Sequence, residues 1–222
     1  VPITTVLTGL SSLFGRGGAP LAAISLGKGD REEAEDYLGN SFMGLILFSL
    51  AVMALGLIFL EPMLALFGAS ENTLPYAADY LRIYLWGTLF VQITVGMNYL
   101  ITTQGFAKTA MVTTMLGAVL NVVLDPLFMF VFGMGIAGAA LATVLAQMVS
   151  CAFVLWFLLG KRTQIRLRVK KLRLKRAPFQ RVMALGASPF FMSTSEGIMQ
   201  ICFNVQMLKY GGGLAVSAMT IL

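Results

Sequence analysis

The chain has 222 residues, of which 58% are hydrophobic and only 12% are charged. A soluble domain has about 25% charged residues, so this composition excludes a water-soluble globular protein. It also excludes intrinsic disorder, because disordered chains are rich in charge and poor in aromatic residues. Together these values predict an all-α polytopic membrane protein.

The sequence contains no histidine, which excludes histidine-based catalytic triads, metal sites and proton relays. Its two cysteines, Cys151 and Cys202, lie in apolar stretches and match no metal or disulfide pattern. No catalytic constellation is visible either. We therefore expect a protein that is not an enzyme and that needs no cofactor.

Stretches with few charges mark the membrane spans, since a spanning helix needs about 20 mostly apolar residues. They predict six spans and the start of a seventh, at about 3–27, 37–60, 80–103, 109–132, 136–159, 183–208 and from 213 onward. The long stretch 109–160 is divided by a tight turn at Gly133-Met134-Gly135. No ten-residue alternation of polarity typical of a membrane β-barrel occurs. Both ends lie in apolar segments, so we expect a fragment of a larger protein.

Residues 161–181 hold ten lysines and arginines and no acid, whereas the whole chain has a net charge of only +6. Basic loops mark the cytoplasmic side. The order of the spans then places the loops 28–36 and 104–108 on that side, and 61–79 and 133–135 on the outer side.

The basic loop 161–181 has two interpretations. A run of like charges can bind nucleic acid. The simpler interpretation, which we favour, is a topology signal with some attraction to anionic lipid. Because this is also the longest cytoplasmic loop, we predict that it links two helical bundles.

Asn121 and Asp125 lie four residues apart in the span 109–132, so they share one face of the helix. Pro126 has no N–H and crowds the carbonyl near Val122, so we expect a kink that frees a backbone oxygen there. A carboxylate, an amide oxygen and a loosened carbonyl can hold a small cation or a proton. The structural alternative is that Asp125 caps a turn begun by Pro126 at the outer interface.

Thr143 lies on the next span, and it and Asp125 are each about nine residues from the turn at 133–135. At 1.5 Å per residue, both lie roughly 13 Å below that turn and can meet at one depth. Thr143 then either completes the site or bonds only to the backbone of its own helix.

Two further charges lie deep within predicted spans, where charged residues are rare and point to function. Glu196, which follows Pro189, indicates a second ion site or a site for a cationic substrate. Its alternative is an acid that reaches the membrane face or a polar neighbour. Arg16 could extend toward the cytoplasmic side, but we favour an ion pair with an acid inside the bundle.

Six motifs, in the same order along the chain, resemble the MATE (multidrug and toxic compound extrusion) family of transporters. They are Gly17-Gly18-Ala19-Pro20; Leu26-Gly27-Lys28-Gly29-Asp30; Pro62-Met63-Leu64 with Phe67-Gly68-Ala69-Ser70; Ala78-Asp79-Tyr80-Leu81; Gln104-Gly105 with Lys108; and Asn121 to Pro126 with Gly133 to Thr143. The resemblance implies a twelve-helix fold of two six-helix lobes, of which this chain covers spans two to seven and the start of eight. Residues 1–160 would form the first lobe without its first helix, 161–181 the cytoplasmic linker and 182–222 the start of the second lobe.

The resemblance also implies a secondary active efflux antiporter in the cell membrane, which exports organic, often cationic compounds in exchange for H⁺ or Na⁺ by alternating access. Members with a cation site in the first lobe use an Asn and an Asp one turn apart on span five and a Thr on span six. Asn121, Asp125 and Thr143 occupy the matching positions, where Na⁺ could bind. Another branch uses an acid on span seven, and Glu196 is similar to it in placement.

The partners implied are drugs or toxic organic cations and the lipid bilayer, with no nucleic acid, and we expect a monomer. The alternative function is that of a lipid-linked precursor flippase of related fold, whose groove would be more basic. Arg16 is the only basic residue deep in a predicted span, so the antiporter is favoured. A membrane scaffold or enzyme subunit without transport is a third, weaker alternative.

Overall fold

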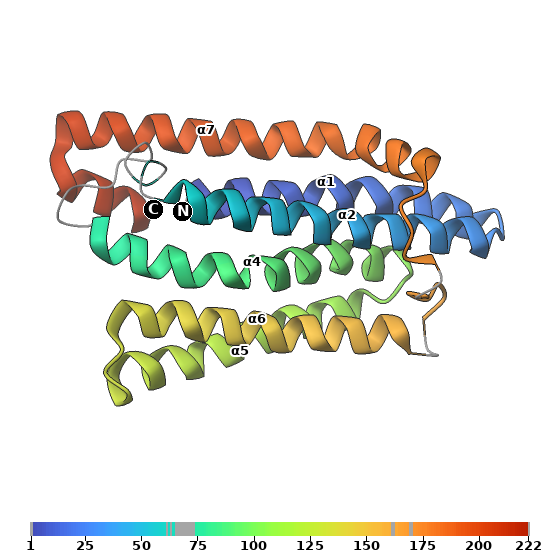
Figure 1. The fold of residues 1–222 in the computed structure, drawn as a ribbon, viewed down its shortest axis with the longest axis horizontal. Helices are drawn as coiled ribbons and strands as arrows, with labels where there is room; N and C mark the ends of the chain where they lie inside the picture. Colours follow the sequence, from blue (N-terminus) through green and yellow to red (C-terminus); the bar gives the residue numbers. More distant parts are fainter. Residues whose placement is uncertain are drawn as a thin grey trace.

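The computed structural model describes residues 2–60, 62, 64, 74–160, 163–168 and 171–221. These residues form a bundle of long helices that run lengthwise through the molecule, and no strand occurs among them (Figure 1). The helices are α1 (Pro2–Gly27), α2 (Arg31–Ile58), α4 (Leu74–Thr103), α5 (Ala107–Pro126), the π-helix η1 (Leu127–Val131), α6 (Gly135–Leu159) and α7 (Arg176–Ile221).

The first six predicted spans each coincide with a helix or, for 109–132, with α5 and η1 together. The segment from residue 213, predicted as the start of a seventh span, belongs to α7, which extends from Arg176 to Ile221. Figure 1 shows α7 turning sharply near its C-terminal end. Glycines occupy positions 211–213, and glycine is one of the few residues at which a helix bends sharply.

Three helical segments are long and apolar enough to cross a membrane by length and composition. They are Arg31–Ile58, Ala107–Val131 and Gly135–Leu159. Helices α1, α4 and α7 are at least as long as α6 and lie alongside these segments (Figure 1). The described part of the chain is therefore a polytopic helical bundle, as its composition predicts.

The turns group at the two ends of the bundle as the span order predicts. The α1–α2 turn, the α4–α5 turn and the linker between α6 and α7 lie at one end, here called the linker end (Figure 1). The α5–α6 turn lies at the opposite end. It contains Gly133 and Gly135 with φ of +65° and +56°, conformations that glycine adopts without strain. The predicted tight turn is confirmed.

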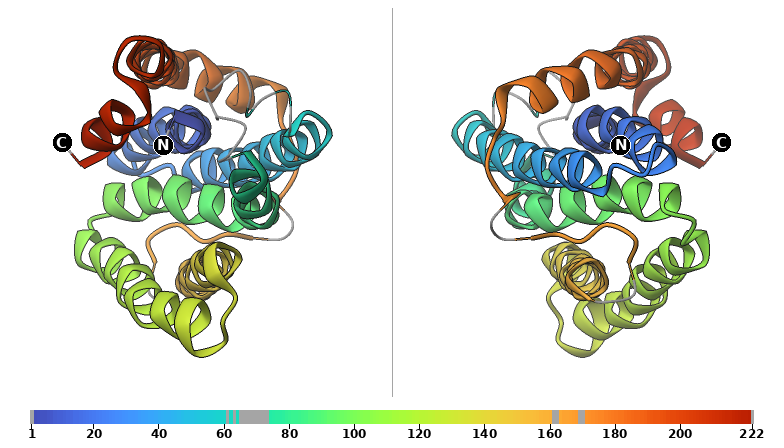
Figure 2. Two further views of the ribbon diagram at one scale, coloured as in Figure 1. Left: turned by 90° about the vertical axis from the view of Figure 1, so that its left-hand side faces the viewer. Right: turned by 90° about the vertical axis from the view of Figure 1, so that its right-hand side faces the viewer.

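Seen from the ends, the helices stack in layers, with α7 over α1 and α2, then α4, and finally α5 and α6 (Figure 2). The core lies mainly where α1, α2 and α4 meet, and its fully buried side chains include Phe14, Leu38, Met97 and Leu100. Helix α5 is the outermost layer and exposes several large apolar side chains, among them Met115. Exposed apolar side chains of this kind suit a helix that faces lipid or another helix.

Helix α7 packs against α1 by direct backbone contact. A Cβ at Gly186 would overlap the carbonyl of Leu13, and a Cβ at Gly17 would overlap the carbonyl of Val182. Small residues let the backbones of two membrane helices approach this closely. Glycine on both helices therefore sets the distance between α7 and the rest of the bundle.

Candidate functional site

The hydrogen-bond pattern of the fourth predicted span changes at Pro126. Helix α5 remains helical up to Pro126, and the N–H of Leu127 then donates to the carbonyl of Leu124. In the π-helix that follows, Phe132 donates to Leu127, at 3.0 Å. Pro126 has no N–H to offer the carbonyl of Val122, and Leu127 bonds to Leu124 instead of Val123, so the irregular hydrogen bonding extends from Pro126 into the π-helix.

Asn121 joins the two other predicted site residues. Its side-chain Nδ2 donates to Asp125 Oδ1 at 3.1 Å and to Thr143 Oγ1 at 3.2 Å. Thr143 in turn donates its hydroxyl proton to the carbonyl of Ala139 at 3.0 Å. All three side chains are partly buried. Thr143 therefore bonds to the backbone of its own helix and also accepts from Asn121 of α5.

Close packing between α6 and η1 brings the two helices into position. A Cβ at Gly138 would lie 2.8 Å from the carbonyl carbon and oxygen of Phe128. A side chain at this position would push α6 away from η1, which precedes it in the chain. Thr143 lies five residues further along α6, where it meets Asn121 of α5.

Tyr80 of α4 is a fourth member of this polar cluster, and the sequence analysis missed it. Its hydroxyl is hydrogen-bonded to Thr143, and it lies close enough to Asp125 to sense its charge. The sequence offers no clear signal for this contact, because Tyr80 lies at the outer start of its predicted span whereas Thr143 was expected roughly 13 Å below the outer turn.

The structure does not bring Glu196 to this cluster. Glu196 is exposed on α7, which packs against α1 and α2, whereas the cluster lies on α4, α5 and α6. Arg16 is exposed as well, and its guanidinium lies 5.2 Å from the ring centre of Tyr99. Within the described residues Arg16 makes no ion pair, and its observed contact is a cation–π contact with Tyr99.

A second polar cluster lies at the linker end, where basic side chains of the linker and of the start of α7 meet the acidic first turns of α2. We call it the linker clasp; its members are Glu33, Glu35 and Asp36 of α2 and Arg168, Lys171, Lys175 and Arg181. Glu35 is its buried member and lies 3.0 Å from Arg168 Nε. Asp36 lies 2.6 Å from Lys175 Nζ. The sequence analysis had placed the five acids of 28–36 and the ten bases of 161–181 on the same side of the membrane. This was the signal from which the linker clasp could have been predicted.

Further hydrogen bonds hold the linker and the start of α7. The side chain of Gln104 accepts from the N–H of Ile165 at 3.2 Å, and its backbone carbonyl accepts from Gln164 at 3.0 Å. Arg181 donates to the hydroxyl of Tyr37 at 2.9 Å. This hydrogen bond raises the pKa of the Arg181 guanidinium further above its ordinary value. The described linker residues thus have a fixed course across the end of the bundle.

Metal-binding chemistry in the described residues is limited. They contain no group of three or more His, Cys, Asp or Glu side chains placed to hold a metal ion. Asp125 is joined instead by an amide and a hydroxyl. Such a set offers few, hard oxygen atoms, which suit a small monovalent cation better than a transition metal.

Comparison with known families decides the class of protein. A family model described as MatE matches residues 1–127. The chain belongs to the MATE family. This family consists of transporters and not of enzymes, so the chain is part of a multi-pass protein of the cell membrane.

Curated relatives of this MATE chain include two proteins named multidrug export protein MepA. The protein from Staphylococcus aureus (strain MRSA252) is 24% identical over 211 residues, and that from Staphylococcus saprophyticus is 26% identical over 211 residues. Each alignment covers 95% of this chain and 47% of the relative. The chain thus spans about half the length of the curated relatives it matches.

Solved structures of transporters have the same fold as this chain over about half of their length. The MATE multidrug transporter DinF-BH, determined in complex with a ligand, is similar with a TM-score of 0.93 and 33% identity, over 100% of this chain and 50% of that one. A MOP superfamily transporter from Pyrococcus furiosus Vc1 is similar with a TM-score of 0.88 and 25% identity, over 99% of this chain and 49% of that one. The fold is therefore about half of a MATE transporter.

Proposed function

We propose that the whole protein is a secondary active multidrug efflux antiporter that exports organic, often cationic compounds in exchange for H⁺ or Na⁺. Its relatives named multidrug export proteins and the structural neighbour described as a multidrug transporter support the substrate class. In this proposal residues 1–160 and 182–222 belong to two lobes, and alternating access arises as one lobe rocks against the other. The observation that carries the proposal is the pair of hydrogen bonds by which Asn121 joins Asp125 of α5 to Thr143 of α6.

The amide of Asn121 gives this cluster two possible states. With its NH₂ group directed at Asp125 and Thr143, the amide satisfies an oxygen atom on each. To hold Na⁺, the residues must present oxygen atoms instead: the carboxylate of Asp125, the hydroxyl of Thr143 and the amide oxygen of Asn121. Asn121 then has to turn its amide by half a turn, which ends its donation to Thr143.

Protonation of Asp125 acts on the same amide. A protonated carboxyl becomes a hydrogen-bond donor, and the amide oxygen of Asn121 is the acceptor nearest along the helix. If the proton sits on Oδ1, the oxygen that accepts from Asn121, the amide of Asn121 has to turn and the bond from α5 to α6 is lost. Either ion therefore changes how α5 and α6 are joined. It can favour the inward-facing or the outward-facing state of the transporter only by binding that state more tightly.

The test uses the full-length gene in a host that lacks its own multidrug pumps. We would follow the efflux of a fluorescent cationic dye while the proton gradient and the sodium gradient are collapsed in separate experiments. We expect one collapse to stop efflux, which would identify the coupling ion. Efflux that survives both collapses, or the absence of efflux for every dye, would count against the antiporter and favour the lipid-linked precursor flippase.

A further inference from the structure

Several buried side-chain oxygen atoms in the described part of the chain have no hydrogen-bond partner, and three of them lie on α4 and α6. They are Oγ1 of Thr94 and Oδ1 of Asn98 on α4, and Oε1 of Gln147 on α6. Buried polar atoms in native proteins nearly always have a partner, and where the protein supplies none the partner is ordered water or an ion. The three oxygens therefore point to water inside the bundle.

Gln147 continues the α5–α6 cluster toward the linker end. It lies one helical turn after Thr143, so the two side chains share one face of α6. A Cβ at Gly117 would lie 3.9 Å from Nε2 of Gln147, and Gly117 is one turn from Asn121 on α5. Gln147 thus forms the next polar layer after Asn121 and Thr143.

Thr94 and Asn98 extend the polar layers along α4, where their spacing of four residues places them on one face. Across the interface Thr94 meets the thiol of Cys151, which follows Gln147 by one turn on α6. A thiol is a weak hydrogen-bonding group, and the oxygen of Thr94 stays without a partner. We call Gln147, Cys151, Thr94 and Asn98 the polar file.

Asn98 brings the polar file to a cavity of about 380 Å³ between the last turns of α4 and the first turns of α5. Its lining includes Thr102 and Ala107, which lie at the linker end of these helices. The cavity has room for several water molecules, since each occupies roughly 30 Å³ in the liquid. Water can therefore reach the polar file from the linker end.

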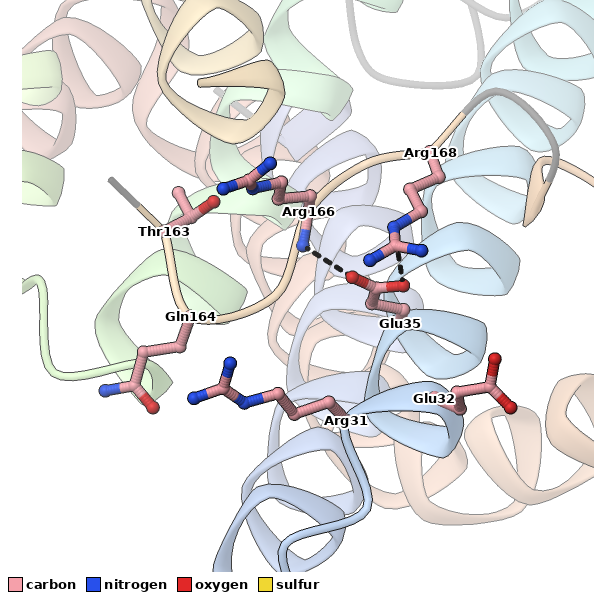
Figure 3. A pocket seen from close by; sticks show the side chains of 7 residues that line it. All are labelled: Arg31, Glu32, Glu35, Thr163, Gln164, Arg166 and Arg168. Carbon is pink, nitrogen blue, oxygen red and sulfur yellow. Dashed lines mark hydrogen bonds and ion pairs between the residues drawn. The ribbon is translucent and has the colours of Figure 1, made fainter. Parts of the chain in front are cut away.

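The linker holds this end of the bundle in place. Gln104, which follows the last turn of α4, is bound by Gln164 and by the N–H of Ile165. Figure 3 shows the next part of the linker, where the N–H of Arg166 and the side chain of Arg168 bind Glu35 of α2. The approach to the cavity thus has a fixed frame.

Polar side chains between membrane helices can also serve only to join the helices. Ser150 has this role nearby, because its hydroxyl donates to the backbone carbonyl of Thr113 of α5 at 3.3 Å. The oxygens of Thr94, Asn98 and Gln147 make no such bond. Polar groups that face water inside a membrane protein, and not each other, are typical of ion pathways.

We propose that water fills the polar file and the cavity, and that the coupling ion passes along them between Asp125 and the linker end. The inference rests on the proposed antiporter function and adds to it the route by which the ion reaches the predicted cytoplasmic side. The side-chain oxygens and the water between them accept hydrogen bonds from a migrating proton, and the same oxygens can coordinate Na⁺. Thr94, Asn98 and Gln147 line the route and carry no charge of their own.

The first test measures access of water in the full-length protein after its native cysteines have been replaced by serine. Asn98→Cys and Gln147→Cys place a thiol on the route, and the control Met97→Cys places one at a neighbouring position of α4 that is 0% exposed in the apolar core. Silver ions, which react with thiols that they reach through water, are added to inside-out membrane vesicles. Thiols that remain free are then counted by maleimide labelling of the denatured protein.

We expect silver to block labelling of Asn98→Cys and Gln147→Cys and to leave Met97→Cys fully labelled. Labelling that silver does not change at both route positions would overturn the route, and so would equal blocking at Met97→Cys. Blocking only in right-side-out vesicles would also overturn it, because the file would then open at the wrong end. None of these results depends on transport, so they separate a failure of the route from a failure of the antiporter.

The second test compares two valine variants in dye efflux. Thr94→Val removes an oxygen of the file with little change of shape, whereas Thr113→Val removes a buried hydroxyl that donates to the carbonyl of Thr109 at 3.0 Å. We expect Thr94→Val to slow efflux about tenfold, the equivalent of about one hydrogen bond, and Thr113→Val to match the parent protein. Equal efflux by the two variants, in a parent whose efflux needs an ion gradient, would overturn the route and leave the antiporter standing.

Discussion

The polar cluster between α5 and α6 and the linker clasp lie toward opposite ends of the bundle and have different compositions. In the first, a single acid, Asp125, is hydrogen-bonded at 3.1 Å to an amide, and in the described chain it forms no ion pair. In the clasp, three acids of α2 face four bases. The buried acid of the clasp, Glu35, alone meets two of these bases.

This difference shows which carboxylate is available for ion exchange. An acid that is already paired with bases can accept a cation or proton only by giving up those pairs. Asp125 needs to give up only one hydrogen bond from Asn121. We therefore expect substitutions in the α5–α6 cluster to change transport more than stability, and substitutions in the clasp to do the reverse.

The largest effect is expected for Asp125→Asn in the full-length protein. The amide has the same shape but cannot bind a proton or cation as a carboxylate does, so export should fall about 100-fold, equivalent to about 2.7 kcal/mol. Dye efflux normalised to the amount of protein in the membrane measures this. Asp79→Asn, which changes an exposed acid of α4, is the control and should export normally. Normal export by Asp125→Asn would remove Asp125 from the mechanism.

The next largest effect is expected for Glu35→Gln, and it should appear in stability. Removal of one partner of a buried ion pair leaves uncompensated charge, but Arg168 is 60% exposed and water will screen it. We therefore expect destabilisation of about 1–3 kcal/mol, measured by thermal unfolding in detergent, with normal export per folded molecule. Glu32→Gln removes an exposed acid of the same helix and should be nearly neutral. Equal effects of the two variants would show that the clasp does not stabilise the bundle.

Much of the α5–α6 cluster could be predicted from the sequence because its geometry is local. The four-residue spacing places Asn121 and Asp125 on one helix face. A tight turn with equal distances on both sides places Thr143 at a similar depth. The contacts at 3.1 and 3.2 Å follow from these two facts together with Gly138, which lets α6 approach.

The clasp and Tyr80 could not be placed in the same way, because they depend on how distant segments pack. The sequence put Glu35 and Arg168 on the same side of the membrane, but it could not show that the linker crosses the start of α2. For Arg16 the charge alone predicted an acidic partner, whereas the packing of Gly15 against Tyr99 brings an aromatic ring next to Arg16 instead. Contacts of this kind are fixed by helix packing, which periodicity does not determine.

A smaller effect on transport is expected for Thr143→Val, which has a matched control in Thr114→Val. Both hydroxyls donate to a carbonyl of their own helix, at 3.0 Å for Thr143 and 3.1 Å for Thr114. Only Thr143 also accepts from Asn121 of the neighbouring helix. We expect Thr143→Val to lower export about five- to tenfold, the equivalent of about one hydrogen bond, and Thr114→Val to leave it unchanged. If both valine variants behave alike in dye efflux, the contact between α5 and α6 plays no part in transport.

The smallest effect is expected for Lys175→Gln, which separates the surface of the clasp from its buried part. Lys175 is 51% exposed and lies 2.6 Å from Asp36, and the substitution keeps the bond of 2.8 Å from its backbone N–H to Asn40. Exposed pairs contribute about 0.2–1 kcal/mol, so the thermal midpoint should fall only slightly. The difference from the parent protein should vanish in 1 M salt, where charges are screened beyond about 3 Å. The loss of stability caused by Glu35→Gln should persist in the same salt, because Glu35 is buried. If salt removes both losses of stability alike, the whole clasp behaves as a set of surface ion pairs.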